Sequence, residues 1–282
     1  MSTTASQGQS VHANGVDIHY LDRGQGDPLV LLHGGVVSTN PIWTGVPIAY
    51  ATHMDTLAEH FRVIAPDTRG GGKTVHSGGA ISFDMLADDV AALIDALDLE
   101  RPLITGFSEG GITATVLAIR HPDAVGAIVN DAGFDAFDPD APTIAMMRQI
   151  LGGSPDATEP DPDAAARGFE ASEQMRAMFE LMKCDQDDGQ GEGHWREYLR
   201  LSWDRCTQPP GYTYADLAKI TAPTLILTGD RDDFCTVEAA VTVYRQLREG
   251  ELAILPGHGH YIPPAAVQTT LEFFARRIAP QS

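Results

Sequence analysis

Residues 102–119, PLITGFSEGGITATVLAI, contain the pattern that decides the fold. The first four residues form an apolar run of the kind that becomes a buried strand. After the glycines, apolar residues return at helical spacing, at Ile112, Val116, Leu117 and Ile119. Between the two lies Gly106-Phe107-Ser108-Glu109-Gly110. The stretch therefore predicts a strand, a sharp turn with Ser108 at its tip, and a helix.

Similar short apolar runs lie on both sides of this unit, at residues 28–32, 61–65, 126–129, 224–227 and 251–255. Continuous apolar strands suit a parallel sheet that helices cover on both faces. Residues 16–21 alternate better and predict an edge strand. Helical periodicity appears again at residues 85–97 and 267–278. The alternation of strand and helix predicts a doubly wound, mostly parallel α/β sheet.

The alternation stops between residues 134 and 219. We predict that this segment is an inserted helical cap, that residues 11–133 and 220–282 form the core domain, and that residues 1–10 are a flexible tail. Within the cap, one helical face carries Met175, Met178, Phe179 and Met182. Packing inside the cap is the first interpretation of this stripe, and an adaptable apolar substrate pocket is the alternative.

The charge balance excludes several classes of partner. The chain has 19 Lys and Arg against 39 Asp and Glu, a formal net charge of -20. This charge argues against binding to nucleic acid or to an anionic membrane surface. Acidic stretches such as residues 156–163 and 185–188, and the pair Asp88 and Asp89, are expected to lie in solvent.

Targeting and cysteine patterns favour a cytoplasmic protein. The first ten residues have no basic segment followed by an apolar one, and no apolar stretch has the roughly 18 residues that a bilayer span needs. The cysteines, Cys184, Cys206 and Cys235, are scattered without metal-ligand spacing. We expect no metal and no organic cofactor. The sequence leaves the oligomeric state open.

The turn at Ser108 has a chemical use. Flanking glycines leave room for a strained turn that exposes the serine. The amide of Glu109 then lies at a helix N-terminus, where it can stabilise a developing negative charge. A serine hydroxyl is a weak nucleophile, so a base must come from another part of the chain.

Four further motifs follow predicted strands: His33-Gly34-Gly35, Asp67-Thr68-Arg69-Gly70, Gly229-Asp230-Arg231-Asp232 and Gly259-His260. With the turn at Ser108, and in this order, they resemble the α/β-hydrolase superfamily. The resemblance covers most of residues 15–133 and 220–278 and leaves the cap unmatched. It implies that Asp67 and Arg69 brace a turn.

The resemblance also implies a serine hydrolase. Ser108 would attack a carbonyl, His260 would act as general base, and Asp232 would orient the histidine. The amides of Gly35 and Glu109 would form the oxyanion hole, and an acyl-enzyme would form on Ser108.

Several neighbours compete for these roles. His258 is the alternative to His260, and the Val36 amide is the alternative to that of Gly35. The alternatives to Asp232 are Asp230, Asp233 and Asp131. The Glu109 side chain has two explanations: a negative charge that stabilises the first turn of the helix, or one that raises the pKa of His260 and disfavours anionic substrates.

We expect a small, neutral and fairly apolar substrate, a carboxylic ester or a lactone. The expected wall residues of its pocket are Trp43, Phe107, Phe134 and Tyr261. The alternatives are amide or aminopeptidase chemistry, a cofactor-independent oxygenase or perhydrolase, and a ligand-binding receptor on the same fold.

Overall fold

A computed structural model describes residues 8–134, 137–138 and 141–278. Eight strands form one sheet in the order β1-β2-β4-β3-β5-β6-β7-β8. Strand β2 (Val16–Arg23) runs antiparallel to β1 (Gln9–Ala13) and to β4 (Arg62–Pro66), and all other neighbours are parallel. The predicted fold class, a doubly wound and mostly parallel sheet, is confirmed.

The parallel strands have the apolar sequences of buried strands. Besides β4, they are β3 (Pro28–Leu32), β5 (Leu103–Phe107), β6 (Ala127–Asp131), β7 (Thr224–Gly229) and β8 (Gly250–Leu255). Every residue of β5, β6 and β7 is buried, because helices cover both faces of the sheet at this point. Strand β8 is only partly buried, since it forms the edge of the sheet.

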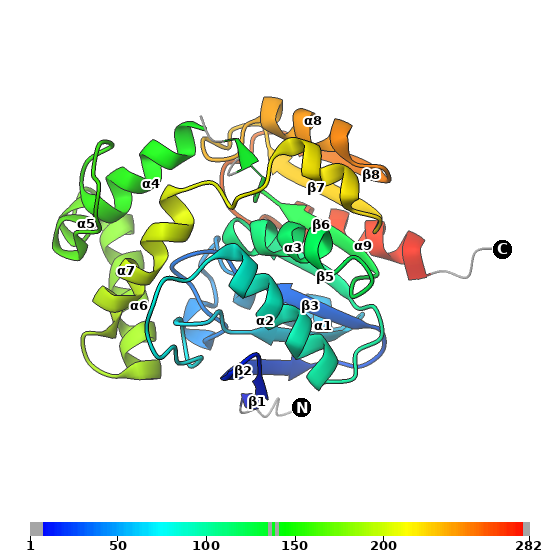
Figure 1. The fold of residues 1–282 in the computed structure, drawn as a ribbon, viewed down its shortest axis with the longest axis horizontal. Helices are drawn as coiled ribbons and strands as arrows, with labels where there is room; N and C mark the ends of the chain where they lie inside the picture. Colours follow the sequence, from blue (N-terminus) through cyan, green and yellow to red (C-terminus); the bar gives the residue numbers. More distant parts are fainter. Residues whose placement is uncertain (1–7, 135–136, 139–140, 279–282) are drawn as a thin grey trace.

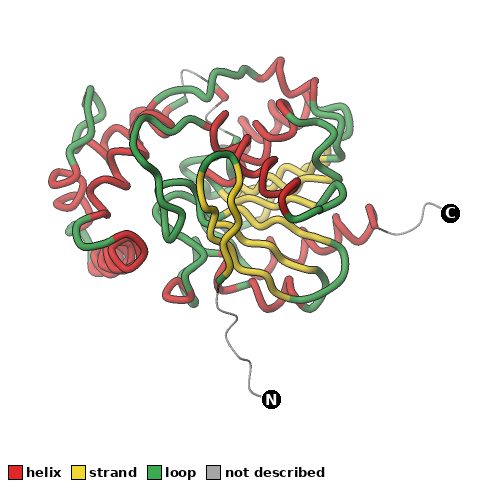
Figure 2. The backbone as a smooth tube through the Cα atoms, turned by 60° about the horizontal axis from the view of Figure 1, so that its bottom comes forward, coloured by secondary structure: helices red, strands yellow, loops and turns green. Residues whose placement is uncertain are grey.

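Helices lie on both faces of the sheet (Figures 1 and 2). One face carries α2 (Phe83–Ala96), α3 (Glu109–Arg120) and α8 (Val237–Gln246), and the other carries α1 (Met54–Ala58) and α9 (Pro264–Ile278). Short 3₁₀ helices occur at Pro41–Trp43, Tyr50–Thr52 and Tyr214–Lys219. Helix α2 begins at Phe83, because the Ser82 side chain accepts a hydrogen bond from the Met85 amide.

The N-terminal prediction is wrong in two respects. Residues 9 and 10, assigned to a flexible tail, belong to β1, whereas residues 1–7 lie outside the described part of the chain. Strand β2 is therefore not an edge strand, since β1 pairs with it. Strand β1 is polar and mostly exposed, so no apolar pattern marked it. The available signal was Asn14-Gly15, whose positive φ angles of 44° and 77° suit a two-residue hairpin turn.

Four helices form a group beside the sheet, at the left of Figure 1. They are α4 (Pro142–Gly152), α5 (Pro162–Phe169), α6 (Glu173–Gln190) and α7 (His194–Thr207). These helices have their own buried cluster, which includes Phe179, Met182 and Tyr198. The methionine stripe therefore packs mainly inside the cap, although Met175 is 38% exposed. The domain boundaries at residues 134 and 219 stay a prediction.

Two carboxylates expected in solvent are buried instead. Asp89 forms a bidentate ion pair with Arg69, with Nε and Oδ2 2.7 Å apart. Asp185, on α6, accepts hydrogen bonds from Trp43 Nε1 at 2.7 Å and from Ser38 Oγ at 2.9 Å. Burial raises the pKa of Asp185. Acidic composition alone does not show which carboxylates a packed neighbour will cover.

No helix within the described ranges is both long enough and apolar enough to cross a bilayer.

Asp88 and Asp89 offer a matched test of this burial. Asp89→Ala leaves the Arg69 guanidinium buried without its partner, so we expect it to lower the free energy of unfolding by about 3–5 kcal/mol. Asp88 pairs with Arg120 near the surface, and Asp88→Ala should cost at most about 1 kcal/mol. Urea unfolding of both variants checks the difference, and equal losses would contradict it.

Candidate active site

Ser108 lies on a strained turn between β5 and α3. Its φ and ψ are 52° and -117°, a conformation that non-glycine residues rarely adopt. The Ser108 amide donates to the Asp131 carbonyl at 2.8 Å, and the Ser108 carbonyl accepts from the Gly111 amide at 2.9 Å. A Cβ on Gly106 would lie 2.2 Å from the Gly110 carbonyl oxygen, so only glycine permits this close crossing of strand and helix.

Three side chains from different loops meet at this turn. His260 Nε2 lies 3.0 Å from Ser108 Oγ, and His260 Nδ1 lies 2.9 Å from Asp232 Oδ2. The other carboxylate oxygen of Asp232 accepts hydrogen bonds from the amides of Phe234 and Cys235, each at 2.8 Å. Since Asp232 can only accept, Nδ1 carries the proton and Nε2 faces the serine as an acceptor.

Two aromatic rings pack against the imidazole. The ring centroids of Phe107 and Phe234 lie 4.7 and 4.6 Å from that of His260. The ring can therefore neither turn nor move away from Ser108 without disturbing this packing. The geometry is the one that nucleophilic catalysis by a serine needs.

The competing residues are held elsewhere. His258 Nδ1 forms a hydrogen bond with the Tyr261 hydroxyl at 2.6 Å, and Asp230 accepts a hydrogen bond from the Gly257 amide. Asp131 is fully buried, and its burial together with the charge of Asp232 raises its pKa well above the ordinary value. Both effects disfavour the ionised carboxylate that would orient the histidine, whereas Asp232 contacts His260 Nδ1 directly.

Two backbone amides beside Ser108 are available to an oxyanion. Within the described residues, the amides of Gly35 and Glu109 make no hydrogen bond, the latter because it opens α3. The Val36 amide, by contrast, donates to the Tyr198 hydroxyl at 3.0 Å. Val36 has a φ of 62°, which is rare for a β-branched residue and is held here by this contact with the cap.

Comparison with known proteins identifies the family. The model of the alpha/beta hydrolase fold matches residues 27–172, just over half of the chain. This chain belongs to the α/β-hydrolase fold family. The family expected from the five motifs is therefore confirmed, and with it the coarser prediction of a hydrolase.

Relatives and similar structures extend over nearly the whole of this α/β hydrolase. The 2-hydroxy-6-oxo-2,4-heptadienoate hydrolase of Pseudomonas putida is 26% identical, over 93% of this chain and 92% of its own. A meta-cleavage product hydrolase from Pseudomonas fluorescens IP01 superimposes with a TM-score of 0.73 at 20% identity, covering 98% of both chains. The enol-lactonase of Burkholderia xenovorans LB400 superimposes with a TM-score of 0.69 at 18% identity, covering 96% of this chain and 99% of its own. These two structures bear on the fold alone.

A cavity of about 110 Å³ opens beside Ser108 in this α/β hydrolase. We call it the Ser108 cavity. Its lining is mostly apolar, and it consists of Gly35, Phe83, Ser108, Glu109, Ile112, Ala132, Gly133, Phe134, Thr143, Met147, Arg205, Cys206, Phe234, Cys235 and His260. Core loops and cap helices α4 and α7 both contribute. In the described ranges, no group of three or more His, Cys, Asp or Glu side chains is placed to hold a metal ion.

Of the four expected wall residues, Phe134 lines the Ser108 cavity and the other three do not. Trp43 is fully buried in the cap cluster, where it donates to Asp185. Phe107 lies in the core, where its ring packs against the His260 imidazole. Tyr261 turns away to bond His258. These predictions rested on sequence proximity to the site, which does not determine the direction of a side chain.

The sequence interpretation missed Arg205 and Cys206, which α7 brings to the Ser108 cavity. Arg205 Nε lies 3.0 Å from Glu109 Oε2, and both side chains are almost fully buried, although the N–H is not aligned for a hydrogen bond. Arg205 also donates to the Leu201 carbonyl at 2.7 Å. The Cys206 thiol lies 3.5 Å from the same carboxylate oxygen. Burial and the charge of Glu109 raise the thiol's pKa, so Cys206 stays protonated.

This ion pair changes the interpretation of Glu109. The sequence suggested either a helix-stabilising charge or a field that acts on His260 and the substrate. Arg205 neutralises the carboxylate at 3.0 Å, so the net field in the cavity is that of an ion pair rather than of a single negative charge. No signal in the sequence indicated the ion pair, because its members are 96 residues apart and meet only when the cap folds over the turn at Ser108.

Proposed function

We propose that this chain is a serine hydrolase that cleaves neutral carboxylic esters or lactones through an acyl-enzyme on Ser108. One observation carries the proposal. His260 Nε2 lies 3.0 Å from Ser108 Oγ, His260 Nδ1 lies 2.9 Å from Asp232 Oδ2, and this group of side chains borders a mostly apolar cavity. The Tyr198 contact that occupies the Val36 amide favours Gly35 as the second oxyanion donor beside Glu109.

The reaction follows from this geometry. His260 Nε2 takes the proton of Ser108 Oγ as the oxygen attacks the ester carbonyl, and Asp232 stabilises the imidazolium. The amides of Gly35 and Glu109 bind the oxyanion of the tetrahedral intermediate. When the intermediate collapses, His260 returns the proton to the alkoxide, which leaves or, in a lactone, remains attached to the acyl group. His260 then deprotonates a water that attacks the acyl-enzyme, and it returns this proton to Ser108 Oγ as the acid is released.

A second candidate is hydrolysis of a carbon–carbon bond. The Pseudomonas putida relative is named for a 2-hydroxy-6-oxo dienoate, which contains a ketone and a carboxylate but no ester. In the described lining of the Ser108 cavity, Arg205 is the only Lys or Arg, and Glu109 already neutralises it. A substrate carboxylate would therefore be desolvated without a free cation. This charge balance favours a neutral ester or lactone.

Two esters of nearly equal size test whether the cavity disfavours a substrate carboxylate. They are p-nitrophenyl methyl succinate, which is neutral, and mono-p-nitrophenyl succinate, which is anionic. We expect kcat/KM for the anionic monoester to be at least about tenfold lower, because its carboxylate loses water without gaining a cation. Hydrolysis of 2-hydroxy-6-oxohepta-2,4-dienoate should be slower still. Equal rates for the two succinates, or a preference for the dienoate, would count against a neutral substrate.

In the same assay, Ser108→Ala should lower kcat by roughly 10⁴-fold or more, because members of a triad act as a unit. An unchanged urea midpoint in this variant shows that the loss is not one of folding. Turnover near the wild-type rate would rule out Ser108 as the nucleophile.

Tyr198→Phe tests the support that the cap gives to the oxyanion loop. The substitution removes the acceptor of the Val36 amide next to Gly35, so we expect kcat to fall roughly tenfold with a smaller change in KM, since the oxyanion forms only after attack. Tyr20→Phe removes a hydroxyl that bonds to Gln9 at 3.3 Å, far from the site, and serves as the control. Equal kcat values for the two variants would contradict a positioning role for Tyr198.

A further inference from the structure

One oxygen of the Glu109 carboxylate lacks a partner. The side chain is 6% exposed, and Oε2 faces Arg205 and Cys206. Oε1 is fully buried and makes no hydrogen bond to any atom of the described residues. A buried, charged acceptor without a donor is unfavourable, and native structures retain such groups mainly where a ligand or a water satisfies them.

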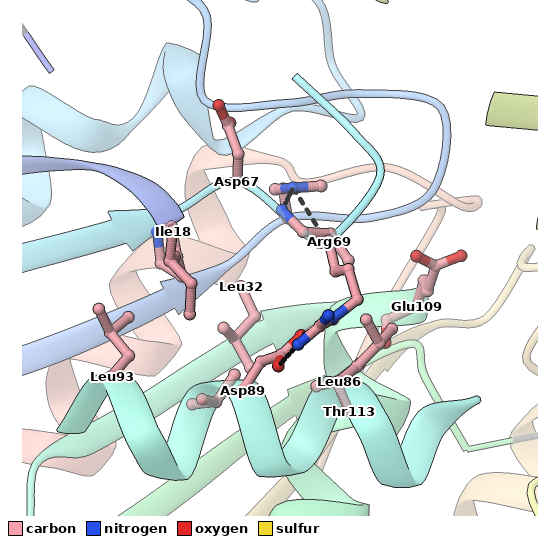
Figure 3. A pocket seen from close by; sticks show the side chains of 14 residues that line it. Ile18, Leu32, Asp67, Arg69, Leu86, Asp89, Leu93, Glu109 and Thr113 are labelled. Atoms are coloured by element: carbon pink, nitrogen blue, oxygen red, sulfur yellow. Dashed lines mark hydrogen bonds and ion pairs between the residues drawn. The ribbon is translucent and has the colours of Figure 1, made fainter. Parts of the chain in front are cut away.

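The position of this carboxylate points to the ligand. Glu109 directly follows Ser108 and lines the Ser108 cavity together with Gly35, and a Cβ on Gly35 would lie 3.4 Å from Glu109 Oε2. Through Oε2, the carboxylate therefore lies beside Gly35, the expected oxyanion donor for the scissile carbonyl. Figure 3 shows that it points away from the Arg69–Asp89 ion pair, which lies on the other side of the Glu109 backbone.

The charges around Glu109 select the kind of group that can bind there. Arg205 already balances the carboxylate, so a substrate ammonium would add an uncompensated positive charge to a buried site. A substrate carboxylate would present lone pairs to the lone pairs of Oε1. A neutral O–H or N–H donates a hydrogen bond and leaves the net charge unchanged.

We propose that Glu109 Oε1 forms a specificity subsite that accepts a hydrogen bond from a neutral hydroxyl or amide N–H close to the scissile carbonyl of the substrate. The proposal rests on the ester or lactone hydrolysis proposed above, and it narrows the substrate class to compounds with such a donor. Arg205 is the positioning residue, because its guanidinium holds the other carboxylate oxygen and thereby orients Oε1.

A buried water is the competing partner for Oε1. Glu109 also lines a second cavity of about 30 Å³, between α2, α3 and the loops after β3 and β4, which is the one drawn in Figure 3. That space is large enough for one ordered water. If such a water satisfies Oε1, a donor on the substrate brings no advantage, so the two explanations predict different selectivity.

The experiment compares kcat/KM of the wild-type enzyme for p-nitrophenyl butanoate and for its 2-hydroxy and 3-hydroxy counterparts. We expect at least one hydroxylated ester to be preferred over the parent by roughly tenfold or more, because a buried acceptor gains its missing partner. Equal kcat/KM values for all three esters would overturn the subsite and leave ester hydrolysis intact. Turnover of none of them by the folded enzyme would instead refute the proposed hydrolysis.

The double variant Glu109→Met with Arg205→Met tests whether this ion pair causes the preference for the hydroxylated ester. It removes both charges together, so neither remains buried alone, and the ratio of the hydroxylated to the parent ester should fall to about one. Met147→Leu changes the same cavity without touching the ion pair and should keep the wild-type ratio. A double variant that retains the preference would overturn the assignment to Glu109. If the methionine pair does not fold, Glu109→Leu with Arg205→Leu gives the same comparison.

Discussion

The site depends on the close crossing of β5 and α3 at Ser108. The serine can hold its strained backbone because Gly106 lets β5 and α3 approach to a distance that a Cβ would forbid. Gly110 likewise lets α3 approach the carbonyls of Leu32 and His33 at the end of β3. That crossing directs Oγ toward His260 and leaves the Glu109 amide without an intrahelical partner. The proposed nucleophile and one proposed oxyanion donor are therefore products of a single backbone constraint, and the buried parallel strands around it keep the constraint rigid.

Helix α7 links the cap to this crossing at two points. The Tyr198 hydroxyl accepts a hydrogen bond from the Val36 amide, next to Gly35, and Arg205 pairs with Glu109, next to Ser108. The ion pair is buried and the hydrogen bond is partly buried, and they reach the two segments that supply the expected oxyanion donors. The cap therefore does more than cover the cavity, because any movement of α7 would alter the donors and the polar wall of the cavity together.

The core of this molecule could be predicted from its sequence because each functional side chain follows a strand with a strong apolar signal. Ser108 directly follows β5, Asp232 lies three residues after β7, and His260 lies five residues after β8. The topology of a parallel sheet brings these strand ends to one edge. Strand β1 escaped notice because its side chains are polar and its partner is antiparallel. Its pairing depends on a two-residue turn rather than on burial.

The contacts of the cap could not be predicted in this way. Asp185, Asp89 and Arg205 look like surface charges in sequence, and each becomes buried only because a partner distant in the chain packs over it. The wall residues show the same limit: Trp43 and Tyr261 lie near the site in sequence, but tertiary hydrogen bonds turn them elsewhere. Helical periodicity indicates which face of a cap helix is apolar, but not which core residue that face meets.

The central claim is that Ser108 is an activated nucleophile. Its most direct test is the intact mass of the protein after incubation with a serine-directed fluorophosphonate, followed by peptide mapping, with Ser108→Ala as the control. We expect a single adduct on the peptide that contains Ser108 and none in the variant. No adduct on the folded wild-type protein would contradict it and would favour a ligand-binding role for the same cavity.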